Sequence, residues 1–332
     1  MSALVLGAAG FLGVNLVDGL QAIGVNPVCG RRRRTNIIPL RSRGVSLVPA
    51  DLDSPGELLA AMRGHHVVFH LAGHYPRTAL HADADLETGL SRTQNVLHAA
   101  AQAGVRRLVF VSSTATVAIA PGRPSTEADT FDRPPGYGVY HDLKWHLEAM
   151  VLAERRLECV VVCPGACIGA WDLRVGTSAI LVATALGLRP PHADGWVPLV
   201  DVQDVARALC RMAVMARPPP RVLLVGHNLR LAPLLAQLSR RYRVAAPVAP
   251  LEPEAARALA DTAERLAEAS GKRAQLSREI VDLVVHGAQI DSSLGRTVLG
   301  APFAALETTL DRFDTFARRM RFIPPQPDEV HV

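Results

Sequence analysis

Short apolar runs alternate with amphipathic segments along the first two thirds of the chain. The first run, Leu4–Leu6, is followed by glycines and then by Val14–Leu20, where apolar residues recur at helical spacing. Five further runs read as buried parallel strands: Val45–Val48, Val67–Leu71, Arg107–Ser112, Cys159–Cys163 and Arg221–Val225. The pattern predicts an α/β fold of the Rossmann type, with a doubly wound parallel sheet and helices on both faces.

Helices are expected between these runs. The clearest are Glu57–Met62, Thr93–Ala103, which Gly104 ends, and Tyr140–Arg155. In an open parallel sheet, ligands bind outside the carboxyl ends of the strands. The residues that would meet at this edge are Gly7, Arg31, Asp51, Gly73, Ser112 and Pro164. We therefore expect the functional site there.

A glycine-rich turn joins the first strand to the first helix. Its sequence is Gly7-Ala8-Ala9-Gly10-Phe11-Leu12-Gly13, a G-x-x-G-x-x-G spacing rather than G-x-G-x-x-G. Gly7 permits the tight turn, Gly10 lets the backbone approach a pyrophosphate, and Gly13 brings the helix close to the strand. The helix N-terminus offers N–H groups to the phosphates. The position of this turn at the start of a β-α-β pattern predicts dinucleotide binding.

Four consecutive arginines, Arg31–Arg34, follow Asn26–Gly30, which is the second strand that the pattern predicts. They stand roughly 20 residues past the glycines, where an NAD-selective site usually has a carboxylate for the ribose 2′-OH. Guanidinium groups bind a phosphate monoester through two hydrogen bonds. We interpret Arg31, with help from Arg32 or Arg33, as a 2′-phosphate clamp that favours NADP(H), with NAD as the alternative. A solvated basic loop, or contact with nucleic acid or an anionic membrane, is the competing interpretation.

The pair Tyr140 and Lys144 carries the candidate chemistry. Residues four apart share one face of a helix, so the Lys144 ammonium can lie near the Tyr140 hydroxyl and a cofactor ribose. We expect the cation to lower the pKa of the tyrosine from its reference of about 10. Tyr140 would then exchange a proton with a carbonyl or alcohol while a nicotinamide exchanges a hydride. The competing interpretation is an ordinary amphipathic helix with one buried tyrosine.

Together these motifs resemble the extended short-chain dehydrogenases/reductases of the NAD(P)-dependent epimerase/dehydratase superfamily. The resemblance runs nearly the full length of the chain. Its matching stretches are Gly7–Gly13, Asp51-Leu52, His70–Gly73, Val109–Thr114, Tyr140 with Lys144 and Glu148, Cys163–Gly165, and Leu199–Ala206.

The resemblance implies roles for individual residues. Asp51 with Leu52 would bind the adenine amine, and Pro164 would order the nicotinamide side. The catalytic hydroxyl would be Thr114, with Ser113 as the fallback. The remaining cofactor contacts that it implies are Gly7, Gly10, Phe11, Leu12, Gly13, Leu71, Ala72, Gly73, Ser112, Tyr140 and Lys144.

Two comparisons within the superfamily imply different reactions. Leu199–Ala206 and the arginine after the second strand are similar to dihydroflavonol-reductase-like and 3β-hydroxysteroid-dehydrogenase-like members. His74-Tyr75-Pro76-Arg77 is similar to hopanoid-associated sugar epimerases of bacteria. The chain also departs from the family at Leu143, where a serine is usual, and at Gly89, where an asparagine is usual. The departure at Gly89 puts a conventional proton relay through that helix in doubt.

The substrate is expected to bind to a second, smaller and mostly helical lobe. We assign residues 1–164 and 198–226 to the NADP-binding domain, residues 165–197 and 227–323 to the substrate lobe, and residues 324–332 to a tail. The expected ligand-facing residues are apolar: Trp171, Ala179–Ala183, Leu186 and Trp196. They favour an apolar carbonyl compound. Arg174 and Arg189 are the cations that a nucleotide-sugar diphosphate would need.

Composition narrows the class of protein. The 332 residues are 49% hydrophobic and 20% charged, and they carry a net charge of +5. Five cysteines without framework spacing indicate buried thiols and a reducing compartment, so we expect a cytoplasmic protein. We expect no membrane span, no secretory segment, no nucleic-acid partner and no metal. The histidines at 66, 70 and 74 lie across a strand, where this spacing does not make a ligand pair.

The sequence thus favours an NADP(H)-dependent oxidoreductase that interconverts a ketone and a secondary alcohol on a mostly apolar small molecule. Tyr140 would be the general acid/base, with Lys144 and a Ser/Thr hydroxyl beside it. One alternative is an epimerase or dehydratase of nucleotide sugars or related compounds that uses tightly bound NAD(P). Another is a non-catalytic NADP-sensing regulator. The resemblance also suggests a homodimer packed through the helices around Thr93 and Tyr140.

Overall fold

A seven-stranded parallel sheet forms the centre of the larger lobe in the computed structural model, which describes residues 1–76, 78–271, 274 and 276–325. The strand order is β3-β2-β1-β4-β5-β6-β9. The strands are β1 (Ala3–Leu6), β2 (Val28–Arg31), β3 (Ser46–Pro49), β4 (Val67–His70), β5 (Arg107–Val111), β6 (Glu158–Pro164) and β9 (Arg221–Leu224). Most of their residues are buried, as expected of a parallel sheet covered on both faces. The predicted Rossmann fold class is confirmed.

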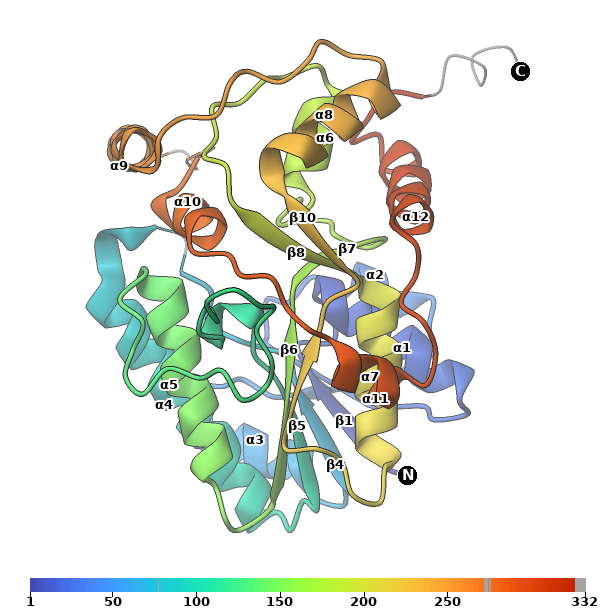
Figure 1. The fold of residues 1–332 in the computed structure, drawn as a ribbon. Helices are drawn as coiled ribbons and strands as arrows, with labels where there is room; N and C mark the ends of the chain where they lie inside the picture. Colours follow the sequence, from blue (N-terminus) through green and yellow to red (C-terminus); the bar gives the residue numbers. More distant parts are fainter. Residues whose placement is uncertain (77, 272–273, 275, 326–332) are drawn as a thin grey trace.

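Two helical layers cover the sheet (Figure 1). One layer holds α3 (Pro55–Met62), α4 (Ala82–Gln102) and α5 (Val139–Ala153). The other holds α1 (Phe11–Ala22), α7 (Val202–Val214) and α11 (Ser293–Leu299), with the short α2 (Ile38–Arg41) nearby. The helix expected from Thr93 begins earlier, at Ala82, because nothing interrupts the helical backbone across Gly89.

A smaller lobe lies beyond the carboxyl ends of the strands (Figure 1). Its three-stranded sheet has the order β10-β8-β7. The strands are β7 (Ala166–Ile168), β8 (Trp196–Asp201) and β10 (His227–Arg230), and the helices are α6 (Ala179–Ala185), α8 (Leu231–Tyr242), α9 (Pro253–Ala269), α10 (Arg278–Val285) and α12 (Leu306–Arg319). The lobe has an apolar core of its own, in which Leu181, Leu238 and Phe313 are buried.

The chain passes between the lobes more than once. Strand β8 pairs with β7 and β10, whereas β9 joins the large sheet beside β6. Helix α11, which follows α10 in the chain, packs against α7 on one face of the large sheet.

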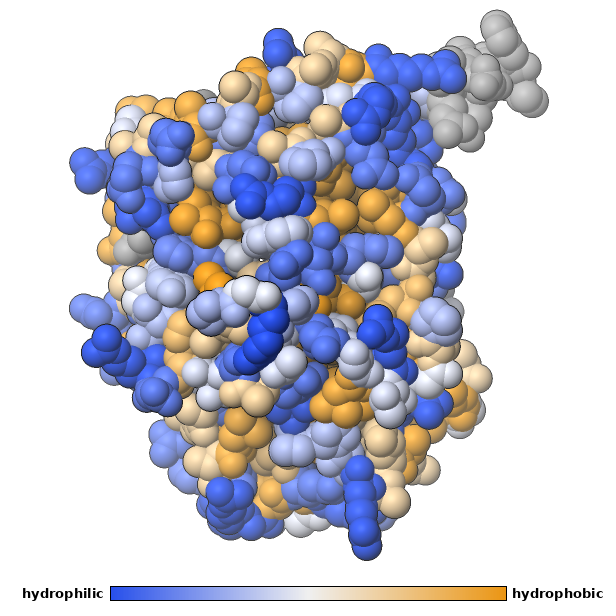
Figure 2. All heavy atoms as spheres, viewed as in Figure 1, coloured by the Kyte–Doolittle hydropathy of each residue, from blue (hydrophilic) through white to orange (hydrophobic). Residues whose placement is uncertain are grey.

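Hydrophilic side chains dominate the face of the molecule in Figure 2, with small apolar areas among them. Within the described ranges, no helix is long and apolar enough to cross a membrane.

Candidate functional site

The glycine turn after β1 has the close approaches that its sequence predicts. Gly7 has a φ of +85°, and a Cβ there would lie 2.8 Å from the backbone N of Ala72. A Cβ at Gly13 would lie 2.2 Å from the carbonyl oxygen of Gly7. Gly10 is the N-cap of α1 without a side-chain cap, and the first turn of α1 carries no acidic residue. This cradle fits the phosphates of a dinucleotide, because side chains would fill it.

The arginine run lies at the end of β2. Arg31 is half-buried, and the next three arginines are exposed. No ion pair among the residues that the structure describes involves Arg31, Arg32, Arg33 or Arg34. Arg32 is near enough to Asp53 to help lower the pKa of that carboxyl. A group of four guanidiniums without an ion-pair partner fits an anionic ligand, and its place at the carboxyl end of β2 fits a phosphate on the adenosine ribose.

Side chains of α4 hold the loop that follows β3. The Asn95 amide donates a hydrogen bond to the carbonyl oxygen of Leu52 (2.9 Å). Arg92 donates to both carboxylate oxygens of Asp53, at 2.8 and 2.6 Å. Asp51 itself is half-buried and accepts a hydrogen bond from the backbone N of Asp53. The loop expected at the adenine is therefore held in place by long-range contacts.

Tyr140 lies in the first turn of α5, with only 9% of its surface exposed. Its hydroxyl is hydrogen-bonded to the side chain of Ser113. Ser113 follows β5 and caps the 3-10 helix η2 (Thr114–Thr116), accepting a hydrogen bond from the backbone N of Ala115. The structure therefore brings the fallback residue, Ser113, to Tyr140, whereas Thr114 opens η2.

Lys144 lies one helical turn beyond Tyr140, on the same face of α5. Its Nζ donates to the carbonyl oxygen of Val111 (3.3 Å) and lies 5.9 Å from the centroid of the Tyr140 ring. It also lies beside Gly73, because a Cβ at Gly73 would be 3.8 Å from Lys144 Nζ. Burial lowers the pKa of Lys144 to about 8.

The pKa of Tyr140 moves in the direction opposite to the sequence prediction. Burial of the phenol raises its pKa above the ordinary value, and nearby Tyr75 adds to the increase, whereas the hydrogen bond with Ser113 lowers it. The expected lowering by Lys144 is wrong for this structure. The physical reason is that desolvation of the phenolate exceeds the interactions that would stabilise it.

A buried polar cluster lies behind these groups. Glu148 accepts hydrogen bonds from the hydroxyls of Ser112 (2.5 Å) and Thr116 (2.8 Å), and from Arg221 Nε (2.5 Å). Cys163 Sγ also faces the carboxylate, at 3.5 Å. The Ser112 hydroxyl is thus turned into the interior, which leaves its backbone for any contact with a cofactor. Glu148 was among the residues that carry the family resemblance, but nothing in the sequence identified Arg221 as its partner.

Tyr75, in the loop after β4, covers Tyr140. The two ring centroids are 4.9 Å apart, and 58% of the Tyr75 surface is exposed. The Nε2 of the preceding His74 forms a hydrogen bond with Asp85, and its Nδ1 accepts one from Arg92. Arg77, the last residue of that sequence motif, lies outside the described residues. Tyr75 was part of the motif, but its contact with Tyr140 was not predicted.

The apolar residues expected to face a ligand have other roles in the smaller lobe. Trp171 lies under the Arg43 guanidinium, 4.5 Å from the ring centroid, and packs on Phe316. Leu181 belongs to the core of the lobe, whereas Leu186 is 52% exposed. Packing explains Trp171 and Leu181, so these two residues no longer indicate an apolar substrate. Arg174 and Arg189 are both exposed.

Two further expectations concern metals and Pro164. No group of three His, Cys, Asp or Glu side chains that could hold a metal ion occurs within the described part of the chain. Pro164 ends β6, beside Leu224 of β9 and at the same edge of the sheet as Gly7 and Ser113. The structure thus places the candidate nicotinamide-side residue at the carboxyl edge of the strands.

Comparisons with known proteins agree with this geometry. A model of the NAD dependent epimerase/dehydratase family matches residues 3–226. The putative dihydroflavonol 4-reductase of Synechocystis sp. is 26% identical over 314 residues, which cover 92% of this chain and 91% of that protein. Cinnamoyl-CoA reductase 1 of Oryza sativa subsp. japonica is 31% identical over 266 residues, which cover 72% of this chain and 76% of that protein.

A solved structure extends the comparison to both lobes. The crystal structure of PA4631, described as a nucleoside-diphosphate-sugar epimerase from Pseudomonas aeruginosa, superposes with a TM-score of 0.79. The two chains are 26% identical, and the match covers 97% of this chain and 99% of PA4631.

Proposed function

This chain belongs to the NAD dependent epimerase/dehydratase family. From that premise, we propose that it uses NADP(H) to interconvert a ketone and a secondary alcohol on a mostly apolar small molecule. One observation carries the proposal: the Tyr140 hydroxyl is hydrogen-bonded to Ser113, with Lys144 one turn along the same helix. The family consists of NAD(P)-dependent enzymes, which weighs against the non-catalytic regulator.

The residues of this chain would move the proton and hold the reacting oxygen. A bound NADPH supplies the hydride that reduces the carbonyl carbon. Because burial raises the pKa of Tyr140, its phenol is protonated near neutral pH and can donate its proton to the carbonyl oxygen. The Ser113 hydroxyl donates a hydrogen bond to the same oxygen. In the reverse direction, Tyr140 accepts the proton of the alcohol.

The cofactor would lie along the carboxyl edge of the large sheet. Gly7, Gly10 and Gly13, with Phe11 and Leu12 in the first turn of α1, would hold the pyrophosphate. The adenine would lie at Asp51 and Leu52, and the nicotinamide side at Leu71–Gly73 and Pro164. Lys144 would hold the adjacent ribose.

The preference for NADP(H) rests on Arg31 and Arg32. Neither of them forms an ion pair within the described residues, although Arg32 is near enough to Asp53 to help lower the pKa of that carboxyl, and Arg31 ends β2. A 2′-phosphate would provide the counter-charge, through two hydrogen bonds from one guanidinium. NAD lacks this group.

An aromatic ketone suits the site better than a nucleotide sugar. The exposed Tyr75 ring on Tyr140 offers an aromatic surface beside the proposed acid. Two relatives have names that refer to aromatic carbonyl compounds. The second candidate is an epimerase or dehydratase with tightly bound NAD(P), which the whole-length likeness to PA4631 favours.

Cofactor titration followed by turnover tests the proposal. The purified protein is titrated with NADPH and NADH, and loss of nicotinamide absorbance is then followed with dihydroflavonols, steroid ketones, phenanthrenequinone and UDP-glucose. We expect tighter binding of NADPH and net oxidation with a ketone. Tight NAD(H) binding without net oxidation on any compound would instead support the epimerase.

Two variants assign the residues. Tyr140→Phe should abolish ketone reduction while retaining NADPH binding. Arg31→Ala should weaken NADPH binding by about 10- to 100-fold and leave NADH binding unchanged, because it removes charge-assisted hydrogen bonds to the phosphate alone. Arg34→Ala removes the same charge from the exposed end of the run and is the matched control. Equal losses for both cofactors would contradict the clamp.

A further inference from the structure

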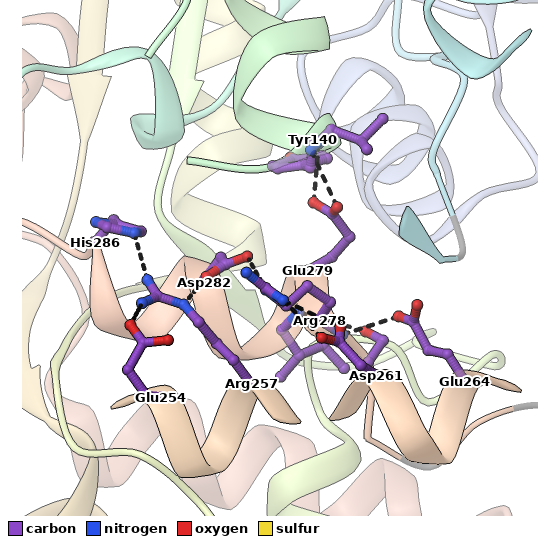
Figure 3. Close-up of polar contacts among 12 residues, drawn as sticks. Tyr140, Glu254, Arg257, Asp261, Glu264, Arg278, Glu279, Asp282 and His286 are labelled. Carbon is purple, nitrogen blue, oxygen red and sulfur yellow. Dashed lines mark hydrogen bonds and ion pairs between the residues drawn. The ribbon is translucent and has the colours of Figure 1, made fainter. Parts of the chain in front are cut away.

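The first turn of α5 is capped by a residue from the other lobe. Glu279, in the first turn of α10, accepts hydrogen bonds from the backbone N–H of Val139 (3.1 Å, to Oε1) and of Tyr140 (2.9 Å, to Oε2). Figure 3 shows the carboxylate pointing at the start of the helix that carries Tyr140. The first N–H groups of a helix have no partner within the helix, and a carboxylate at this end also interacts favourably with the helix dipole.

Gly138 makes this approach possible. It is the N-cap residue of α5 and has no side chain with which to cap the helix itself. Its φ of +126° is a conformation that residues with a Cβ rarely adopt. A Cβ at this position would lie 3.3 Å from Glu279 Oε2 and 3.4 Å from Asp282 Oδ2. The glycine therefore lets a carboxylate from another element replace the missing cap.

An ion-pair network anchors the helix that carries Glu279. Asp282 accepts a hydrogen bond from Arg257 Nε (2.8 Å), which joins α10 to α9, and another from Arg278 Nε (3.0 Å) within α10 (Figure 3). The backbone N of Arg278 donates to Glu264 Oε1 (2.9 Å), and its guanidinium also pairs with Asp261. These contacts leave α10 little freedom, so the position of the Glu279 carboxylate is well defined.

Glu279 differs from Asp282 in its partners. The two guanidiniums compensate the charge of Asp282, whereas the hydrogen bonds of the Glu279 carboxylate within the described ranges go to backbone N–H groups of α5. Glu279 is only 2% exposed. Burial raises its pKa, and the hydrogen bonds from Tyr140 and Val139 lower it. A buried carboxylate held mainly by two amides of one helix turn ties the position of that turn to α10.

We infer that Glu279 is a positioning residue, which fixes the backbone of Tyr140 from the substrate lobe and so aligns its hydroxyl with Ser113 and Lys144. The inference rests on the proposed function, in which Tyr140 is the proton donor. Its consequence is that the substrate lobe does more than hold the substrate. Through Glu279, the packing of α10 on α9 determines whether the acid in the other lobe is correctly placed.

The Glu279→Gln variant tests this inference, because glutamine keeps the shape but replaces one acceptor oxygen with an NH₂ donor. We expect hydrogen exchange of the amides of residues 139 and 140 to become at least roughly ten-fold faster, with or without NADPH. With phenanthrenequinone or the ketone that the panel identifies, we expect kcat to fall about ten-fold and KM to change less than about three-fold.

Glu254→Gln is the matched control. It makes the same change in an exposed carboxylate of α9, which pairs with Arg257 of the same helix. We expect exchange at residues 139 and 140 and kcat to stay within about two-fold of wild type. If Glu279→Gln does not fold, Glu279→Asp keeps the charge but cannot reach both amides, and the same loss of protection is expected.

The possible results separate the inference from the proposed function. Unchanged exchange in Glu279→Gln, or unchanged kcat in a variant that is only less heat-stable, would overturn the positioning role. If the wild-type enzyme reduces no ketone, the proposed function fails. The exchange of the two amides then still decides whether Glu279 fixes the start of α5.

Discussion

Gly89 of α4 lies against the side chain of Leu143 of α5, so closely that a Cβ at Gly89 would be 2.5 Å from Leu143 Cδ1. These two residues are the positions at which the sequence analysis expects departures from the family pattern. Leu143 is fully buried, and α4 runs unbroken past Gly89. The two departures are therefore one packing arrangement, because the leucine occupies the space that a side chain on α4 would need.

A side chain at Gly89 should destabilise the protein through its contact with Leu143. We expect Gly89→Asn to lower the free energy of unfolding by about 1–3 kcal/mol, because the core must be overpacked. In the Gly89→Asn/Leu143→Ser double variant, the loss should be smaller than the sum of the single losses by about 1 kcal/mol. Urea unfolding of the four proteins measures the coupling.

Gly56 offers a control for the effect of replacing a helical glycine with asparagine where no neighbouring atom is in the way. It lies in α3, and a Cβ there would meet no atom within 4 Å. Gly56→Asn should change the free energy of unfolding by less than about 0.5 kcal/mol. Strict additivity at Gly89 and Leu143 would show that the two residues do not compete for space.

The hydroxyl that assists Tyr140 should be that of Ser113. Ser113→Ala should lower kcat for ketone reduction by about 100-fold, because it removes a donor to the reacting oxygen. Thr114→Val keeps the side-chain shape and should lower kcat by less than about three-fold. Steady-state kinetics of both variants decide between the residues, and a larger loss in Thr114→Val would restore the sequence-based choice.

Lys144 should make stability increase with pH in the alkaline range. Burial lowers its pKa to about 8 in the folded protein, whereas the unfolded chain titrates near its ordinary value of about 10.4. Between these values the unfolded state binds more protons, so the free energy of unfolding rises with pH through this group. Below about pH 8 Lys144 is charged in both states, so the free energy of unfolding is reduced by the full cost of burying the ammonium.

Comparison with Lys144→Met isolates this contribution. Unfolding in urea is measured for both proteins at several pH values from about 7 to 10. The stability of the wild type relative to the variant should increase by about 1–3 kcal/mol over this window. A difference that is flat, or that falls with pH, would show that Lys144 is not desolvated in solution.

Removing both charges of the buried Glu148–Arg221 ion pair should destabilise the protein less than removing one of them. Arg221→Met leaves the Glu148 carboxylate buried without its counter-charge, which we expect to cost about 3–5 kcal/mol. The Glu148→Gln/Arg221→Met double variant should recover at least about 1 kcal/mol of this loss. Denaturant unfolding checks both values, and a double variant less stable than Arg221→Met would contradict the explanation.

The sequence by itself determined the features that depend on local order and periodicity. Alternating apolar runs and helical segments predicted the parallel sheet, and the glycines at 7, 10 and 13 predicted the cradle at the start of α1. The spacing of Tyr140 and Lys144 predicted that they share a face of one helix. Each of these properties follows from residues close together in the chain, for which backbone geometry leaves few choices.

Only the tertiary structure decided the features that depend on distant segments and on burial. Ser113 reaches Tyr140 because of the way the chain turns after β5, and Glu279 reaches the backbone of Tyr140 across 139 positions of sequence. The increase in the pKa of Tyr140 comes from the many groups that exclude water around it, and no spacing rule reports their combined effect. Gly89 and Leu143 looked like separate departures because their contact exists only once α4 and α5 pack together.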